Sequence, residues 1–109
     1  MSVQQMTRLR VALGDYAHTK ALKNSEIASR SLAFDFAQIK PVFKAFGTMI
    51  REQAFDVSEM AIVTYLQAKS HGKPMVLLPA VMMGRFQHHC MLYNAEHGRI
   101  TPSDLPGRR

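Results

Sequence analysis

The chain has 109 residues, of which 47% are hydrophobic and 20% are charged, and its formal net charge is +6. This length leaves room for one small domain with one modest core, and we treat residues 1–109 as a single lobe. No apolar run approaches the roughly 18 residues of a membrane helix, and the first eight residues lack the apolar segment of a secretory signal. We therefore expect a cytoplasmic protein that does not span a membrane.

The basic residues are scattered and form no stripe with interleaved aromatic residues. The positive charge therefore indicates solvated surface first and a small anionic ligand second, and it does not indicate a nucleic-acid partner. The single cysteine, Cys90, excludes an internal disulfide and fits a reducing compartment. Because Cys90 begins the apolar run of residues 90–93, we expect a small buried residue there rather than a catalytic thiol.

The first half of the chain predicts strands that alternate with helices. Residues 9–14 form a compact apolar strand closed by glycine, and the polar residues 15–19 lead into a short helix that ends before Asn24. Residues 32–39 begin with alternating apolar positions, which indicates a second strand. Pro41 suits the first position of the next helix. The apolar stripe of that helix consists of Val42, Phe46, Met49 and Ile50.

Residues 55–57 predict a third strand, which breaks into polar groups where another helix begins. Ser58 is a good cap for that helix, and Gly72 lies where the helix should end. The side chains expected to face the sheet are those of Ile62, Val63 and Leu66.

The second half predicts further strands. Residues 75–79 are continuously apolar, as a strand covered on both faces requires. After a polar interruption, we expect a strand at residues 90–93, a turn at residues 94–98, and a last strand after residues 101–104. Strands that alternate with helices predict a three-layer α/β fold with an open, mostly parallel sheet.

Polar side chains follow several of these strands, and ligands of open α/β sheets bind beyond the carboxyl ends of the strands. Asp15 and Tyr16 follow the first strand, Ser58 and Glu59 follow the third, and Arg85 follows the fourth. Each has a structural alternative, because Asp15 and Ser58 are good helix caps and Glu59 would suit the helix dipole. Arg85 could also pair with a surface carboxylate.

His88 and His89 are candidates of a different kind. Imidazole titrates near neutrality, so His88 could act as an acid, or it could be an exposed loop residue. Adjacent residues on a strand point to opposite faces, so the two histidines are not expected to share a metal ion.

Much of the chain resembles one enzyme family. Residues 55–61, Phe-Asp-Val-Ser-Glu-Met-Ala, are the most specific part of this likeness. Its other stretches are residues 32–36, 45–51, 64–68, 73–74, 78–79, 85–88 and 101–105. These segments resemble the 4,5-dihydroxyphthalate decarboxylases, whose fold is the two-lobed one of type 2 periplasmic solute-binding proteins. The resemblance implies that this chain is the first, incomplete lobe of such a fold, without the second lobe.

The resemblance also implies a reaction, the loss of CO2 from an aromatic dicarboxylate such as 4,5-dihydroxyphthalate to give protocatechuate. This chemistry is intelligible without a cofactor or a metal. It needs cations for two carboxylates, a base near the phenol and an acid near the ring carbon. Arg85 could hold a carboxylate, and His88 could be the catalytic acid. Glu59 or Asp15 could take the phenolic proton, with Ser58 and Tyr16 as further substrate contacts.

Two other functions share this fold. The chain could be the ligand-binding lobe of a transporter's solute-binding protein for a small organic anion, although the expected absence of a signal counts against export. It could also be the ligand-sensing domain of a regulator, although no DNA-binding helices precede residue 9. We therefore expect a small anionic aromatic partner, and the oligomeric state, including a homo-oligomer, stays open.

Overall fold

The computed structural model describes residues 5–84 and 90–107 of the chain. The chain divides into two compact units, Met1–Pro79 and Ala80–Arg109. Each unit is described by itself below.

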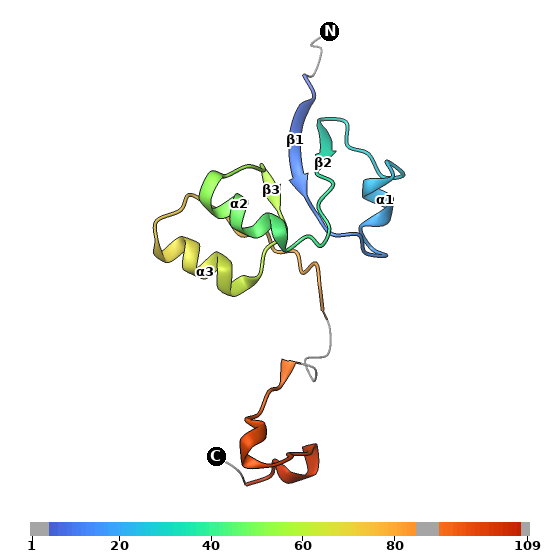
Figure 1. Ribbon diagram of the computed structural model, residues 1–109. Coiled ribbons are helices and arrows are strands. Elements are labelled where there is room, and N and C mark those ends of the chain that lie inside the picture. The colour runs from blue at the N-terminus through green and yellow to red at the C-terminus, as the bar shows by residue number, and fades with distance from the viewer. Residues whose placement is uncertain (1–4, 85–89, 108–109) are drawn as a thin grey trace. The chain divides into compact units, whose positions relative to one another are not determined.

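The first unit contains a three-stranded parallel sheet. Its strands are β1 (Thr7–Ala12), β2 (Leu32–Phe36) and β3 (Val57–Ser58), in the order β2-β1-β3. Figure 1 shows β1 between the other two strands. A helix follows each strand along the chain, so the predicted α/β class is confirmed for this unit.

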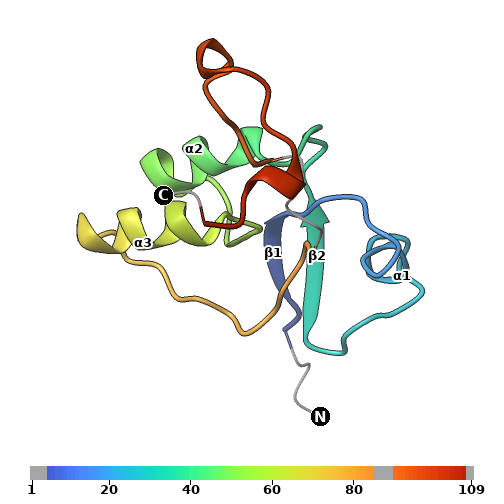
Figure 2. The same cartoon turned by 90° about the horizontal axis from the view of Figure 1, so that it is seen from below.

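The helices of this unit are α1 (Lys20–Lys23), α2 (Lys44–Glu52) and α3 (Ile62–Ser70). In two perpendicular views, α1 lies on the β2 side of the sheet, whereas α2 and α3 lie on the other side of β1 (Figures 1 and 2). Within residues 5–84 and 90–107, no helix combines the length and the apolar character that crossing a bilayer would require.

The register of the sheet separates two faces. Val11 lies opposite both Phe36 of β2 and Val57 of β3, while Ala12 lies opposite Ser58. Successive residues of a strand point to opposite faces. Val11 and Phe36 therefore share one face, and Ala12 and Ser58 share the other.

Helices α1 and α2 contact these opposite faces. The ammonium group of Lys23, on α1, lies 5.7 Å from the centre of the Phe36 ring. On the other face, Ala12 packs in one cluster with Ala45 of α2 and with Phe55, and all three side chains are buried. The small side chains of Ala12 and Ala45 let α2 approach the sheet closely. Partly buried side chains complete this core, namely Ala37, Ile39, Met49 and Ala54.

Helix α2 begins later than predicted. Pro41 is not at its first position, since the helix starts at Lys44. The carbonyl oxygens of Pro41 and Val42 instead accept hydrogen bonds from the N–H groups of Lys44 and Ala45, at 3.2 and 2.9 Å, and form the turn that precedes the helix. Phe46, Met49 and Ile50 of the predicted stripe are partly buried in α2, and Val42 is partly buried in the turn before it, but the buried residue of the helix is Ala45, which the prediction did not include.

The prediction that Ser58 caps a helix is wrong. Ser58 is the last residue of β3, and its hydroxyl donates a hydrogen bond to the Glu59 carbonyl at 2.9 Å. Because Glu59 also donates its N–H to the carbonyl of Ala12 at 2.9 Å, pairing with β1 holds both residues in the sheet. Helix α3 begins only at Ile62. Glu59 is therefore not in a first helical turn.

The buried side of α3 also differs from the prediction. Ile62, Val63 and Leu66 do not face the sheet, because 55%, 62% and 56% of these residues is exposed. Ala68 is buried instead. Thr64 and Tyr65 are partly buried, and with Ala68 they follow helical spacing. The predicted end is confirmed, since α3 stops at Ser70 and Gly72 adopts a left-handed φ of 71°.

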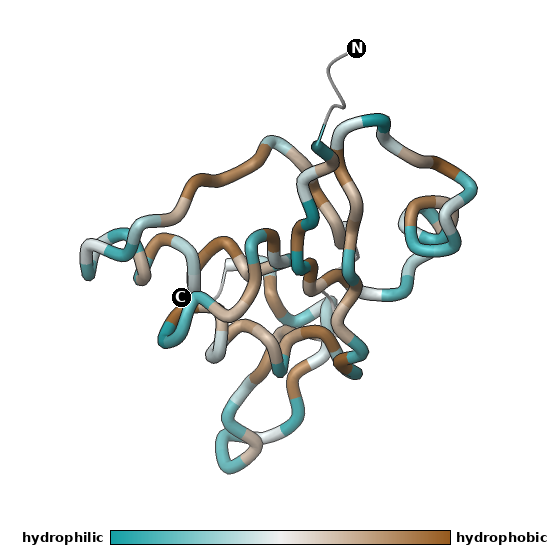
Figure 3. The backbone as a smooth tube through the Cα atoms, turned by 90° about the horizontal axis from the view of Figure 1, so that it is seen from above, coloured by the Kyte–Doolittle hydropathy of each residue, from teal (hydrophilic) through white to brown (hydrophobic). Residues whose placement is uncertain are grey.

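The two later strands are absent. Residues 75–79 and 90–93 do not belong to any strand, and Val76 is 87% exposed. Figure 3 shows the first of these runs as an extended apolar stretch. Cys90 is exposed and has a free thiol, so the expectation of a buried residue is wrong. Hydrophobicity alone does not make a strand, which needs a hydrogen-bonded neighbour.

The described residues of the second unit include the 3₁₀ helices η2 (Ala95–His97) and η3 (Pro102–Asp104). The first occupies the predicted turn. At the second, the N–H and the hydroxyl of Thr101 donate hydrogen bonds to Asp104 Oδ2 at 2.8 and 2.7 Å. The hydroxyl, followed by the backbone N–H, lowers the pKa of Asp104. No strand follows η3 within the described residues, which end at 107.

We predict that Phe55→Ala destabilises the first unit by about 3–5 kcal/mol, the usual cost of removing a buried aromatic side chain. Phe55 is 6% exposed and holds the cluster around Ala12 and Ala45. Urea denaturation followed by circular dichroism measures the change. Phe43→Ala is the matched control, because Phe43 is 62% exposed and its loss should change stability by less than about 0.5 kcal/mol. Equal losses in the two variants would contradict this core.

Candidate functional site

The carboxyl ends of β1 and β3 lie side by side, because Ala12 pairs with Ser58. The chain leaves β1 through residues 13–19, and Glu59 follows β3 directly. This arrangement is the edge at which open α/β sheets bind ligands. It brings together three of the predicted site residues, Tyr16, Ser58 and Glu59, and it adds Asp15 through the same segment as Tyr16.

The carboxylate of Glu59 ties the segment after β1 to the end of β3. Its Oε1 accepts a hydrogen bond from the Tyr16 hydroxyl at 2.6 Å, and its Oε2 accepts one from the N–H of Gly14 at 3.1 Å. A distance of 2.6 Å is typical of a charge-assisted bond between a hydroxyl and a carboxylate. Both oxygens therefore hold partners 43 and 45 residues away in the sequence.

Gly14 is required for this arrangement. The Tyr16 ring folds back over it so closely that a Cβ atom at Gly14 would lie 2.5 Å from the ring. The Tyr16 ring also stacks on the His18 ring, with centres 5.4 Å apart and planes at 10°. A side chain at position 14 would push Tyr16 away from Glu59.

Thr19 organises the same segment from the inside. It is 3% exposed, and its hydroxyl accepts a hydrogen bond from the N–H of Tyr16 at 2.9 Å. The hydroxyl proton faces the carbonyl oxygens of Gly14 and Tyr16, at 2.9 and 3.1 Å. From the sequence, Thr19 was expected only to belong to a polar segment. A threonine just before a short helix is a weak signal, because it usually indicates a cap.

Asp15 is held by two lysines from different parts of the chain. Lys23, on α1, forms an ion pair with Oδ1, and Lys40, between β2 and α2, lies 2.7 Å from Oδ2. The Lys23 ammonium also donates to the Leu13 carbonyl at 3.0 Å. The Lys23 side chain is 16% exposed, compared with 48% for Asp15 and 78% for Lys40. Lys23 is therefore the fixed cation of this cluster, whereas Lys40 is surrounded by water.

These contacts set the charge of Asp15. The hydrogen bond from Lys23, and then that from Lys40, lowers the pKa of Asp15 to about 2. Asp15 in turn raises the pKa of Lys40. A carboxylate with so low a pKa is a weak base at neutral pH, which makes Asp15 a poor candidate for taking a phenolic proton.

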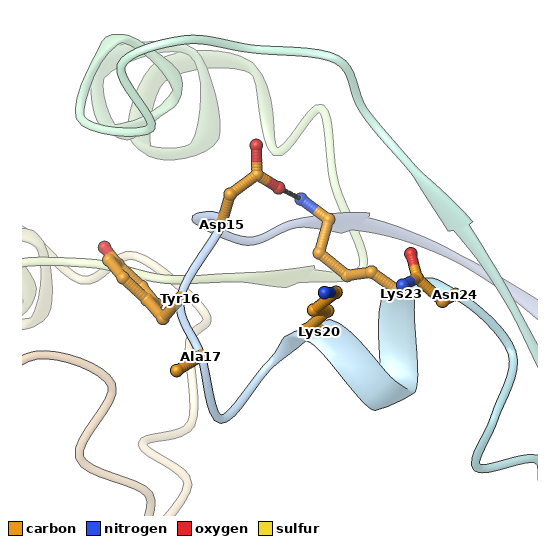
Figure 4. Close-up of a pocket in the computed structure, with 6 residues that line it drawn as sticks. All are labelled: Asp15, Tyr16, Ala17, Lys20, Lys23 and Asn24. Carbon is orange, nitrogen blue, oxygen red and sulfur yellow. Dashed lines mark hydrogen bonds and ion pairs between the residues drawn. The ribbon is translucent and has the colours of Figure 1, made fainter.

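A hollow of about 360 Å³ opens beside these groups. Its lining consists of Asp15, Tyr16, Ala17, Lys20, Lys23 and Asn24. Figure 4 shows Asp15 and Tyr16 on the segment after β1, the two lysines on α1, and the ion pair that joins Asp15 to Lys23. Two ammonium groups, an amide and an aromatic ring offer hydrogen bonds and charge to a small anion.

Three predicted residues take no part in these contacts between Glu59, Tyr16 and Asp15 or are not described: Ser58, Arg85 and His88. Ser58 is partly buried at the sheet edge, and its hydroxyl is engaged with the Glu59 carbonyl. Arg85 and His88 lie outside the described residues. Lys23 and Lys40 were not predicted as site residues, because in the sequence they are two of many scattered basic residues. Among the described residues, no three or more His, Cys, Asp or Glu side chains group together as metal ligands would.

We predict that Thr19→Val destabilises the first unit by about 1–3 kcal/mol, because it removes the buried hydroxyl that accepts from the Tyr16 N–H and donates to the Gly14 carbonyl. Because valine keeps the shape of threonine, the loss of stability measures the contribution of the hydroxyl group. Thr19→Ser, which keeps the hydroxyl, should lose less. Urea denaturation gives the free energies, and faster hydrogen exchange at the Tyr16 amide locates the change. Unchanged exchange in the valine variant would contradict the hydrogen-bond pattern.

We predict that the Asp15 carboxyl titrates near pH 2 in an NMR titration of its side-chain carbon. Because this pKa lies below the ordinary 3.8, the ion pairs stabilise the fold above pH 3.8, and that stabilisation is lost as the pH falls toward about 2. Lys23→Met should raise the midpoint toward 3.8, since Lys23 has the largest effect. Lys69→Met, on α3, should leave it unchanged. A wild-type midpoint near 3.8 would rule out these ion pairs in solution.

No protein-family model, curated protein or solved structure matches this chain. The α/β sheet and the polar groups at its carboxyl edge are therefore the basis on which a function can be argued.

Proposed function

We propose that this chain binds a small anionic aromatic molecule at the carboxyl edge of its sheet and belongs to a decarboxylase that resembles the 4,5-dihydroxyphthalate decarboxylases. Two observations that share Tyr16 carry the proposal: its hydroxyl donates a hydrogen bond to the Glu59 carboxylate, and its side chain lines the hollow that Lys20 and Lys23 also line. A carboxylate that already accepts a phenolic O–H can accept one from a ligand. Neighbouring ammonium groups suit the carboxylates of the same ligand.

The sheet supports the proposal at the level of the fold class. Three parallel strands with the order β2-β1-β3 end at one edge, and helices α1 and α2 contact opposite faces. Under the proposal, this sheet is one lobe of a type 2 periplasmic-binding-protein-like fold. The ligand would then have a second lobe on its other side. Such a ligand takes half its contacts from each lobe, so the isolated chain is expected to bind weakly.

The proposed reaction assigns one step to each residue. The substrate phenol replaces the Tyr16 hydroxyl at Glu59, which takes the phenolic proton and lets the oxygen push electron density into the ring. His88 gives a proton to the ring carbon that bears the departing carboxylate. The bond between that carbon and the carboxylate then breaks, CO2 leaves, and its electron pair restores the aromatic ring. Arg85 holds the carboxylate that stays.

Glu59 is the proposed base for two physical reasons. Its carboxylate lies next to a phenol within hydrogen-bond distance, whereas Asp15 is occupied by two lysines. The low pKa of Asp15 also weakens it as a base. General-base catalysis typically contributes about 10²–10⁴-fold to a rate.

We predict that the protein releases CO2 from 4,5-dihydroxyphthalate and that Glu59→Gln lowers kcat by about 10²-fold or more, the usual contribution of a general base. CO2 release and protocatechuate formation are measured together. Glu52→Gln is the matched control, because Glu52 is an exposed residue at the end of α2. The melting temperatures of both variants are measured as well. A Glu59→Gln variant of unchanged stability and low kcat has lost the base, whereas a lower melting temperature shows that the contact with Gly14 also mattered.

Two results would contradict the proposed reaction. Binding of 4,5-dihydroxyphthalate without CO2 release would indicate a ligand-binding lobe of the solute-binding kind. The absence of both binding and release, at ligand concentrations high enough to detect the weak binding expected of one lobe, would show that the carboxyl edge does not serve this class of ligand.

A further inference from the structure

We propose that Lys23 is the principal anion-binding group of the hollow and that Asp15 is an internal counter-ion which a bound carboxylate displaces. This inference rests on the proposed function, since it describes how the same site would receive its ligand. It assigns ligand binding to Lys23 and Lys40, and it makes Asp15 a competitor of the ligand rather than a partner.

Lys23 is positioned without help from Asp15. Its ammonium donates to the Leu13 carbonyl at 3.0 Å and lies 5.7 Å from the centre of the Phe36 ring. An ammonium group has three N–H donors. With one of them on Leu13, the group keeps its place when Asp15 leaves, and its other donors become available to a ligand. A cation that is fixed before binding loses little entropy when the ligand arrives.

Asp15 occupies the place that a ligand carboxylate would take. Its two oxygens bind two ammonium groups, Lys23 and Lys40, which come from separate segments. These are the contacts a carboxylate ligand would need. Asp15 is also 48% exposed and belongs to a segment without regular structure. Its side chain can therefore rotate into water at low cost.

The rest of the hollow suits a second polar group. Lys20 and Asn24 line it together with the Tyr16 ring. An aromatic dicarboxylate could thus set one carboxylate on Lys23, the ring near Tyr16, and the other carboxylate toward Lys20. A monocarboxylate would use only the first of these contacts. The site should therefore prefer phthalate to benzoate.

The test is isothermal titration calorimetry of the whole 109-residue chain with phthalate and with benzoate, at low ionic strength. Asp15→Asn should tighten phthalate binding by about fivefold, because the ligand no longer has to displace a carboxylate from Lys23. This factor corresponds to the upper end of the free energies measured for exposed ion pairs. Lys23→Met should weaken it by about tenfold or more, as loss of a partly buried charged contact does. Lys40→Met, which changes a side chain 78% exposed, should weaken it less. Lys69→Met, an exposed lysine on α3, is the matched control and should change nothing.

Each outcome supports or overturns the role of Asp15 as a counter-ion or the assignment of the second carboxylate. Unchanged or weaker phthalate binding in Asp15→Asn would overturn the inference, and this variant alters an exposed residue, so it is expected to fold. If Lys23→Met unfolds, Lys40→Met and Asp15→Asn still test the counter-ion role. Equal binding of phthalate and benzoate would overturn the assignment of the second carboxylate.

The inference and the proposed reaction fail in different ways. Tighter phthalate binding in Asp15→Asn, without CO2 release from 4,5-dihydroxyphthalate by the wild type, would support the anion site and contradict the decarboxylase. If the wild type, Asp15→Asn and Lys23→Met release CO2 at the same rate, the result would support the decarboxylase and contradict the anion site at Lys23.

Discussion

The carboxyl edge of this sheet depends on the two hydrogen bonds that Glu59 accepts from Gly14 and Tyr16. They join the end of β3 to the segment after β1, which has no regular structure of its own. The buried hydroxyl of Thr19 then fixes the backbone of that segment from the opposite side. With both anchors in place, Asp15 and Tyr16 are held at the rim of the hollow rather than on a free loop.

The charges at this edge are arranged asymmetrically. One half-buried lysine is tied to a backbone carbonyl, while its carboxylate partner and the second lysine are exposed. Exposed ion pairs contribute little to stability. The cluster is therefore better suited to exchanging one carboxylate for another than to holding the fold together. This is why we connect it to anion binding, and why the core around Phe55 matters more for stability.

The apolar pattern of this sequence does not predict well which side chains are buried. Ile62, Val63, Leu66 and Val76 are all more than half exposed, although their spacing or their continuity predicted contact with a sheet. Hydrophobic periodicity indicates which residues share a face of an element. Which other element packs against that face depends on the tertiary structure. In α3 the buried side passes through Ala68, which is 3% exposed, and not through the larger Leu66.

The sequence by itself determined the α/β class, the alternation of strands with helices over residues 7–70 and the end of α3 at Gly72. Short-range patterns carry these features: alternating apolar positions, helical spacing and a glycine that accepts a left-handed backbone. It also placed Asp15, Tyr16 and Glu59 after strands. Only the tertiary structure decided that Ser58 extends β3 instead of capping a helix, that Glu59 binds Tyr16, and that Lys23 and Lys40 meet at Asp15. Those contacts join residues far apart along the chain, and sheet register, which no local pattern contains, brings them together.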